Sequence, residues 1–115
     1  MVALNGEKLV AKNLKKIQER MVKSFLDVLI MAELRNALLS GYDVISYINT
    51  KFGILVSSGT VYSLLYSLER KGLVEGAWIE KKRTYKLTEK GEKTITAILN
   101  AHETIEGFMV NLLKA

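Results

Sequence analysis

The chain has 115 residues, the size of one small domain with a single core, and 49% of them are hydrophobic. It contains no cysteine and one histidine, which excludes disulfides, thiol catalysis and cysteine- or histidine-rich metal sites. The formal net charge is +5, and no apolar segment is long enough to cross a bilayer, so we expect a cytoplasmic protein that is not bound to membranes.

Positive charge is concentrated in two segments. Residues 1–23 and residues 70–88 each carry six basic and two acidic side chains, a net charge of +4 in each case. Residues 24–69 and 89–115 have net charges of −2 and −1. This distribution is typical of a protein that binds a polyanion, although lysines on a solvated helix would give the same pattern at the N-terminus.

The first segment, residues 1–23, is predicted to be a basic helix from about residue 7 onward. Its apolar residues repeat at four, three and four positions and form a narrow stripe: Val10, Leu14, Ile17 and Met21. A stripe this narrow is typical of a helix that packs on a partner helix, so we expect the segment to dimerise or to flank DNA.

Residues 24–56 are predicted to form two helices and a short extended piece. Ser24 and Asp27 suggest a capping box before an apolar helix that runs to Leu39 and is broken by Ser40 and Gly41. Residues 42–52 have the spacing of a short amphipathic helix that Gly53 ends. Residues 54–56 are expected to be extended and to pair beside a hairpin.

Residues 58–71 are predicted to form a third helix with one apolar face. The opposite face has no acid and carries side chains that form hydrogen bonds: Thr60, Tyr62, Ser63, Tyr66, Ser67 and Arg70. Ser57 or Ser58 can cap its start and Gly72 can end it. Such a face suits phosphates and base edges, although an ordinary amphipathic helix with a polar exterior would also have this pattern.

A β-hairpin is predicted directly after this helix. Residues 73–80 and 84–87 are strand-like, and residues 80–83 form a charged turn that contains Lys81, Lys82 and Arg83. Helices followed by a basic hairpin indicate a winged helix-turn-helix over residues 24–88, mainly α with a small β-hairpin. We expect the three basic residues to bind DNA phosphates. The amides of Ser58, Gly59 and Thr60 would do the same, and Tyr42 would either donate to a phosphate or pack.

The last segment, residues 89–115, is predicted to form one helix from a Thr88 cap to about Leu113. Residues on one side of it repeat at three and four positions: Ile95, Ile98, His102, Ile105, Met109 and Leu112. We expect this stripe, together with Leu14, Ile17 and Met21, to form a homodimer interface. The alternative is that the two terminal helices pack on each other within one chain.

Four motifs together resemble the PadR family of transcriptional regulators: residues 41–45, 58–62, 68–75 and 85–91. The resemblance covers about residues 25–113, but this chain has no proline, whereas the family often has proline at the positions of Ser58 and Ser63. It implies a winged helix that dimerises through its terminal helices. It also allows a small-molecule effector between subunits, although no residue identifies a ligand.

The sequence therefore predicts a sequence-specific transcriptional regulator that binds double-stranded DNA as a homodimer. Two alternatives remain open: a non-specific nucleoid-associated protein, and a winged-helix module that binds only proteins. We expect no enzyme activity, cofactor or metal, because the sequence has no catalytic Ser/His/Asp arrangement, paired carboxylates or phosphate loop.

Overall fold

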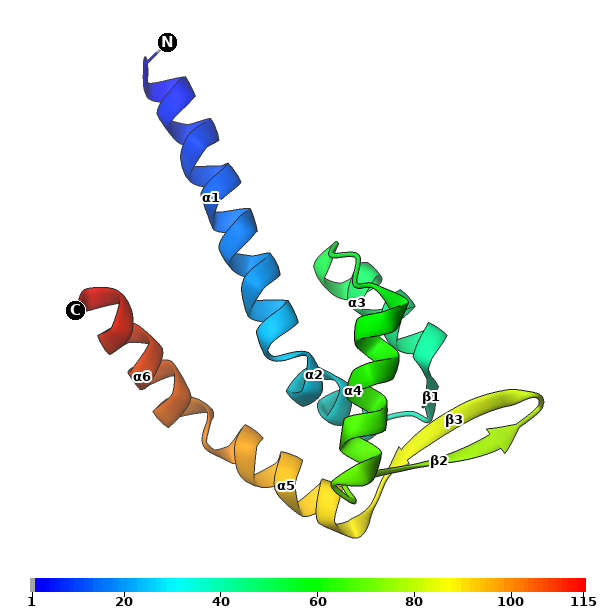
Figure 1. The fold of residues 1–115 in the computed structure, drawn as a ribbon. Coiled ribbons are helices and arrows are strands. Elements are labelled where there is room, and N and C mark those ends of the chain that lie inside the picture. Colours follow the sequence, from blue (N-terminus) through cyan, green and yellow to red (C-terminus); the bar gives the residue numbers. More distant parts are fainter. Residues whose placement is uncertain (1) are drawn as a thin grey trace.

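The computed structural model describes residues 2–115 and the side chains from residue 6 onward, so Met1 of the predicted N-terminal segment lies outside the described residues (Figure 1). In chain order, its elements are α1 (Val2–Ser24), α2 (Leu26–Leu34), β1 (Leu39–Ser40), α3 (Gly41–Phe52), α4 (Ser58–Arg70), β2 (Val74–Ile79), β3 (Lys82–Leu87), α5 (Glu89–Asn100) and α6 (His102–Lys114). The predicted class, mainly helical with a small hairpin, is confirmed.

The hydrophobic core lies between α2, α3, α4, α5 and the sheet. Its fully buried side chains come from four helices and one strand: Leu26, Ile30, Val44, Ile48, Val61, Leu65, Val74 and Ile95. In α4 the predicted apolar face is buried at Val61, Leu65 and Leu68. Burying this face places the polar face of α4 on the outside of the domain.

The sheet has three antiparallel strands in the order β1-β3-β2. Leu39 and Ser40 pair with Tyr85 and Thr84 of β3, so β1 occupies the position that we expected residues 54–56 to take. That expectation is wrong. The side chains of Ile54 and Val56 are buried in the core, and that of Leu55 is 75% exposed. This alternation of buried and exposed side chains packs the segment on the core without pairing it to a strand.

The predicted capping box at Ser24 and Asp27 is also wrong, because Ser24 continues α1 and α2 begins without a side-chain cap. The capping box lies instead at the start of α3. The Asp43 amide donates to Ser40 Oγ over 3.1 Å, and the Ser40 amide donates to Asp43 Oδ2 over 2.9 Å. The helix that we expected to reach Leu39 ends at Leu34. Ser40 can therefore lie in β1 and also cap the start of α3.

Other predicted helix ends are confirmed. Ser57 caps α4, Thr88 caps α5, and Gly53 ends α3 in the left-handed conformation with φ 67°. Gly72, which follows α4, has φ 74°, a value that an L side chain rarely adopts. These local signals fix where the helices of the domain begin and end.

The predicted single C-terminal helix is two helices, because α5 and α6 are separated at Ala101, whose φ and ψ are −90° and 14°. Ile95 of α5 is fully buried in the core of its own chain, and Ile98 packs against that core. Ile95 is therefore a core residue and not the subunit contact that the helical repeat suggested.

The N-terminal part of α1 and the whole of α6 extend from the domain as two diverging arms (Figure 1). Together with the hairpin on the other side, they give the molecule dimensions of 56 × 31 × 21 Å. Within the described part of the chain, no helix combines the length and the apolar character that spanning a membrane requires.

Candidate nucleic-acid interface

The outer face of α4 is a row of polar and aromatic side chains held by the buried apolar face. Tyr62 is 50% exposed and Tyr66 is 62% exposed, and Thr60 and Ser63 are exposed as well. Ser67 is half-buried. The Arg70 guanidinium lies 5.6 Å from the centre of the Tyr66 ring, a cation–π distance. The face therefore presents hydroxyls, rings and one positive charge.

The start of α4 offers two free first-turn amides and not the expected three. The Ser57 hydroxyl oxygen accepts the Thr60 amide over 3.2 Å, and the two hydroxyl oxygens of Ser57 and Thr60 lie 2.8 Å apart. The Thr60 amide is therefore already used. A helix leaves its first amides without internal partners, and at Ser58 and Gly59 these amides remain available to an anion.

The start of α3 packs directly against this face. A Cβ atom at Gly41 would collide with the Tyr62 ring, so the absence of a side chain at Gly41 leaves space for the ring in this position. Tyr42 follows at once and is 68% exposed. This exposure argues against a packing role for Tyr42 and leaves its hydroxyl free to donate.

The hairpin formed by β2, its turn and β3 (residues 74–87, here called the wing) projects beside α4 (Figure 1). Its turn is tighter than predicted, because only Glu80 and Lys81 lie between the strands, with φ values of 50° and 68°. Lys82 and Arg83 are strand residues paired with Ile79 and Trp78. Two-residue turns favour Asn-Gly, so a glutamate and a lysine in this conformation carry local strain.

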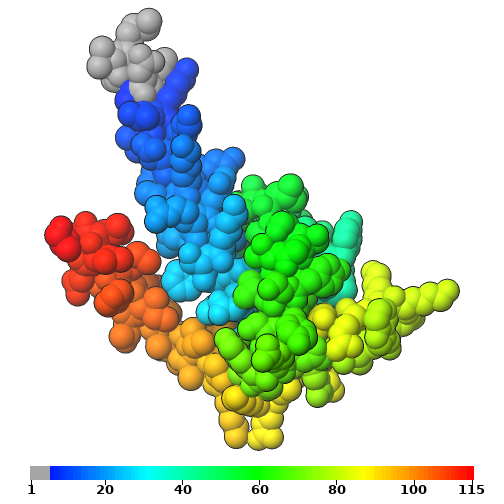
Figure 2. All heavy atoms as spheres, viewed as in Figure 1, coloured from blue at the N-terminus to red at the C-terminus, as the bar shows by residue number. Residues whose placement is uncertain are grey.

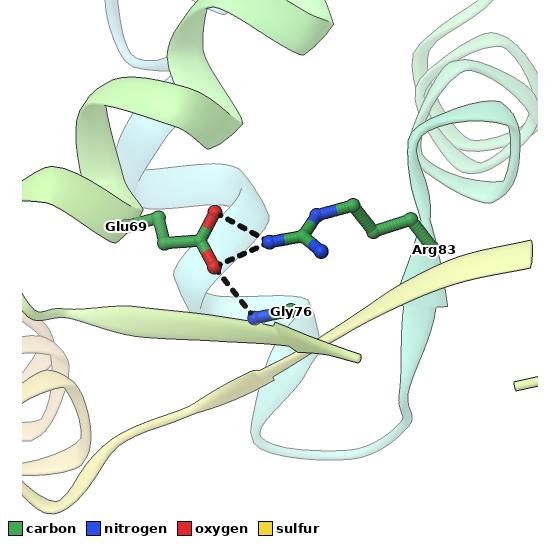
Figure 3. A network of polar contacts seen from close by, with 3 residues as sticks. All are labelled: Glu69, Gly76 and Arg83. Carbon is green, nitrogen blue, oxygen red and sulfur yellow. Dashed lines mark hydrogen bonds and ion pairs between the residues drawn. The ribbon is translucent and has the colours of Figure 1, made fainter. Parts of the chain in front are cut away.

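The basic residues of the wing differ in their partners. Arg83 Nη2 lies 2.7 Å and 3.0 Å from the two carboxylate oxygens of Glu69 in α4 (Figure 3). Lys81 and Lys82 form no ion pair with any other described residue. Lys81 and Lys82 therefore remain candidates for the predicted phosphate contacts, whereas Arg83 is already engaged.

Glu69 also accepts the Gly76 amide over 3.0 Å, so its carboxylate joins α4 to both strands of the wing (Figure 3). Hydrogen bonds from Arg83 and from the Gly76 amide lower the pKa of Glu69 below its usual value. The hydrogen bond to Glu69 raises the pKa of Arg83. Both groups are consequently charged at neutral pH.

Sequence reasoning missed two features of this surface. Glu69 was treated only as part of a family motif, and no local pattern links it to Arg83, which lies 14 positions later. Trp78 was taken as an ordinary strand residue, yet it is 71% exposed on the wing. The signal for Trp78 was its place one residue before the end of a strand that extends beyond the core.

A second exposed surface lies along the two arms. Five of the apolar residues expected at a subunit contact are between 41% and 59% exposed: Leu14, Ile17, Met21, Ile105 and Leu112. Met109 is half-buried, and His102 is exposed with Nδ1 3.0 Å from the Leu99 carbonyl oxygen. Beside these residues lies an apolar groove of about 730 Å³, visible as a hollow between the arms (Figure 2).

Comparison with known proteins places the chain in a family. The model described as "Transcriptional regulator PadR-like family" matches residues 30–97. A PadR-like regulator from Bacillus cereus is 24% identical, with a TM-score of 0.71 over 84% of this chain and 98% of that one. A PadR family regulator from Eggerthella lenta is 19% identical, with a TM-score of 0.70 over 97% and 98%.

A third structure was solved with DNA bound. It is Bacillus subtilis PadR in complex with operator DNA, which is 27% identical with a TM-score of 0.60 over 64% of this chain and 46% of that one. No curated protein sequence matches the chain. The family model spans more than half of the chain and includes α3, α4, the wing and most of α5. The resemblance inferred from the four motifs is therefore confirmed, and the chain belongs to the PadR-like family of transcriptional regulators.

Proposed function

We propose that this regulator binds a specific double-stranded DNA site as a homodimer, with α4 in the major groove and the wing on the adjacent backbone. The observation that carries the proposal is the polar outer face of α4, where the one acid of the helix, Glu69, is already paired with Arg83, beside two wing lysines that form no ion pair with a described acid. Duplex DNA presents phosphates to such lysines and base edges to such a face.

The side chains divide into two roles. We assign base reading to Thr60, Tyr62, Ser63, Tyr66 and Ser67, which α4 carries on one face, with Arg70 at its end placed for base or backbone. We assign backbone contacts to Tyr42, Lys81, Lys82 and the amides of Ser58 and Gly59. With 13 residues, α4 is about 20 Å long, and a helix fits the major groove, which is about 12 Å wide.

The arms support the homodimer. A soluble monomer seldom exposes a continuous apolar surface, and here the exposed stripes of α1 and α6 border an apolar groove. The arms diverge in space, which favours a second subunit between them over packing of the two helices within one chain (Figure 2). A two-fold dimer presents two copies of α4, and its site is then a palindrome.

Selection of bound duplexes from a random library, with the purified full chain, tests this function. We expect an enriched palindrome whose half-sites lie about one helical turn apart. If random DNA competes as well as any enriched sequence, the protein coats DNA without reading it. If no duplex binds even at low salt, the alternative of a protein-binding module is favoured.

The same assay tests the role of α4. Tyr66→Ala should weaken binding to the enriched site by about 1–3 kcal/mol and weaken binding to random DNA less. Tyr66→Phe is the matched control, because it keeps the ring under Arg70 and removes only the hydroxyl group. Equal loss on both DNAs would show that Tyr66 does not read sequence.

A further inference from the structure

The end of α4 and the wing are joined by one carboxylate, that of Glu69. The Glu69 side chain is 29% exposed and that of Arg83 36% exposed, so the ion pair between them is partly shielded from water. Both Glu69 oxygens accept from Arg83 Nη2, and Oε2 also accepts the Gly76 amide. The contact therefore joins one helix residue to one residue in each strand of the wing.

The position of Gly76 explains why its amide is free for this contact. β2 lies at the edge of the sheet, and Gly76 pairs with Tyr85 of β3. In an antiparallel pair, alternate residues point their amides away from the neighbouring strand. The Gly76 amide points outward in this way, and Glu69 provides the acceptor that a third strand would otherwise supply.

The absence of a side chain at Gly76 leaves space for the Arg83 guanidinium in this position. A Cβ atom there would lie 2.9 Å from both Cζ and Nε of Arg83, because the guanidinium lies across the Gly76 backbone on its way to Glu69. The Arg83 guanidinium is also 5.6 Å from the centre of the Tyr85 ring, which is buried in the core. Arg83 is thus held between a core aromatic ring, the backbone of the edge strand and a carboxylate.

We propose that Glu69 is a positioning residue that fixes the angle between α4 and the wing, so that both reach DNA in one preorganised arrangement. The proposal rests on the DNA-binding function proposed above and adds a residue that need not touch DNA. A wing that is already ordered loses less conformational freedom on binding, which strengthens affinity. It follows that Lys81 and Lys82, and not Arg83, provide the phosphate contacts of the wing.

This role and simple electrostatics predict changes of opposite sign. Removing a negative charge near a polyanion should tighten binding if charge alone matters. Loss of a positioning contact should weaken binding despite the more favourable charge. Glu69→Gln separates these cases, because it removes the charge and keeps an oxygen that can accept the Gly76 amide.

The matched control is Glu75→Gln. Glu75 lies on β2, pairs with Lys86 over 3.1 Å at the surface and has no contact with α4 among the described polar contacts. The Glu75→Gln substitution therefore removes one negative charge from the same region, as Glu69→Gln does, and leaves the α4–wing contact intact. Two further variants disrupt that contact differently: Arg83→Met removes its donor, and Gly76→Ala displaces the guanidinium while both charges remain.

DNA affinity is measured by fluorescence anisotropy of a labelled duplex over a range of salt concentrations. We expect Glu69→Gln and Arg83→Met each to weaken binding by about 3- to 10-fold and Gly76→Ala to weaken it less, because the guanidinium can shift, whereas Glu75→Gln leaves it unchanged or tighter. The double variant of Glu69 and Arg83 should be no weaker than either single variant. In Arg83→Met, the slope of log K against log salt should equal that of the wild-type protein.

Two results would overturn the proposal. One is tighter binding and a steeper salt slope for Glu69→Gln, because Glu69 would then only neutralise Arg83. The other is a reduced salt slope for Arg83→Met with normal affinity for Glu69→Gln, because Arg83 would then be a phosphate contact in its own right.

A measurement without DNA separates this proposal from the proposed function. Backbone ¹⁵N relaxation should show an ordered wing in wild type and Glu75→Gln, and lower order parameters for residues 76–83 in Glu69→Gln. Faster hydrogen exchange of the Gly76 amide is expected in Glu69→Ala, which removes the acceptor of that amide. An equally ordered wing in Glu69→Gln would refute the positioning role even if no duplex were found to bind.

Discussion

Ile105→Asp is expected to convert the proposed dimer to monomers without unfolding the domain. Ile105 lies on α6, is 42% exposed in the single chain and lines the apolar groove between the arms. A second subunit that covers the groove would bury the new carboxylate in a mainly apolar lining, in which Lys51 and His102 are the basic side chains. The cost therefore falls on association and not on folding of the core, which α6 does not enter.

The magnitude follows from burial and from the cost of neutralising the acid. Covering the exposed 42% of an isoleucine contributes about 1 kcal/mol of transfer free energy. Keeping an aspartic acid protonated at pH 7, about three units above its usual pKa, costs about 4 kcal/mol. A symmetric dimer contains two such sites, so even half of the combined cost would weaken dimerisation by more than about 1,000-fold.

Sedimentation velocity measures whether the protein is a dimer or a monomer, and circular dichroism measures whether its helices are retained. The control is Val110→Asp, because Val110 lies on the same helix, is 46% exposed and does not line the groove. We expect monomers for Ile105→Asp and dimers for Val110→Asp, with the helical signal of the domain retained in both. A dimeric, fully helical Ile105→Asp protein would refute the assignment of this groove to the second subunit.

Two further predictions concern stability. Gly91→Ala should destabilise the domain by several kcal/mol, because its Cβ would collide with the backbone carbonyl of residue 73. Gly107→Ala, in open space on α6, should instead stabilise the protein by about 1 kcal/mol. Similar melting temperatures for the two variants would contradict this prediction. The hydrogen bond from the Ser40 amide lowers the pKa of Asp43 from its usual value of 3.8. The stability that the ionised Asp43 side chain contributes is therefore present above pH 3.8 and is lost as the pH falls through the lowered pKa of the folded protein. Urea unfolding of Asp43→Asn between pH 7 and pH 2.5 should lack this loss, and an equal loss in both proteins would refute the capping role.

The sequence predicted α4 and its ends because those signals are local. Val61, Leu65 and Leu68 repeat on one face, Ser57 offers a hydroxyl at the right position, and Gly72 tolerates a positive φ. The polar outer face then follows from burial of the other. The hairpin was predictable for the same reason, since its strands are adjacent along the chain.

Features that depend on distant partners could not be predicted. β1 has only two residues, and its pairing with β3 across more than 40 positions leaves no local pattern. Ile95 and Ile105 belong to the same helical repeat, yet one is fully buried and the other is 42% exposed, because the repeat does not say what covers each turn. The break at Ala101 has neither a glycine nor a proline to mark it.

The central claim is that α4 and the wing bind duplex DNA, and the salt dependence of binding tests it most directly. The measurement compares wild type with the Lys81→Ala/Lys82→Ala variant on the selected site and on random DNA. Four lysines per dimer on phosphates account for a slope in log K against log salt of up to about 3.6, so the variant should lose up to this amount on both DNAs. Binding that is insensitive to salt, or a slope that the double variant leaves unchanged, would contradict the account.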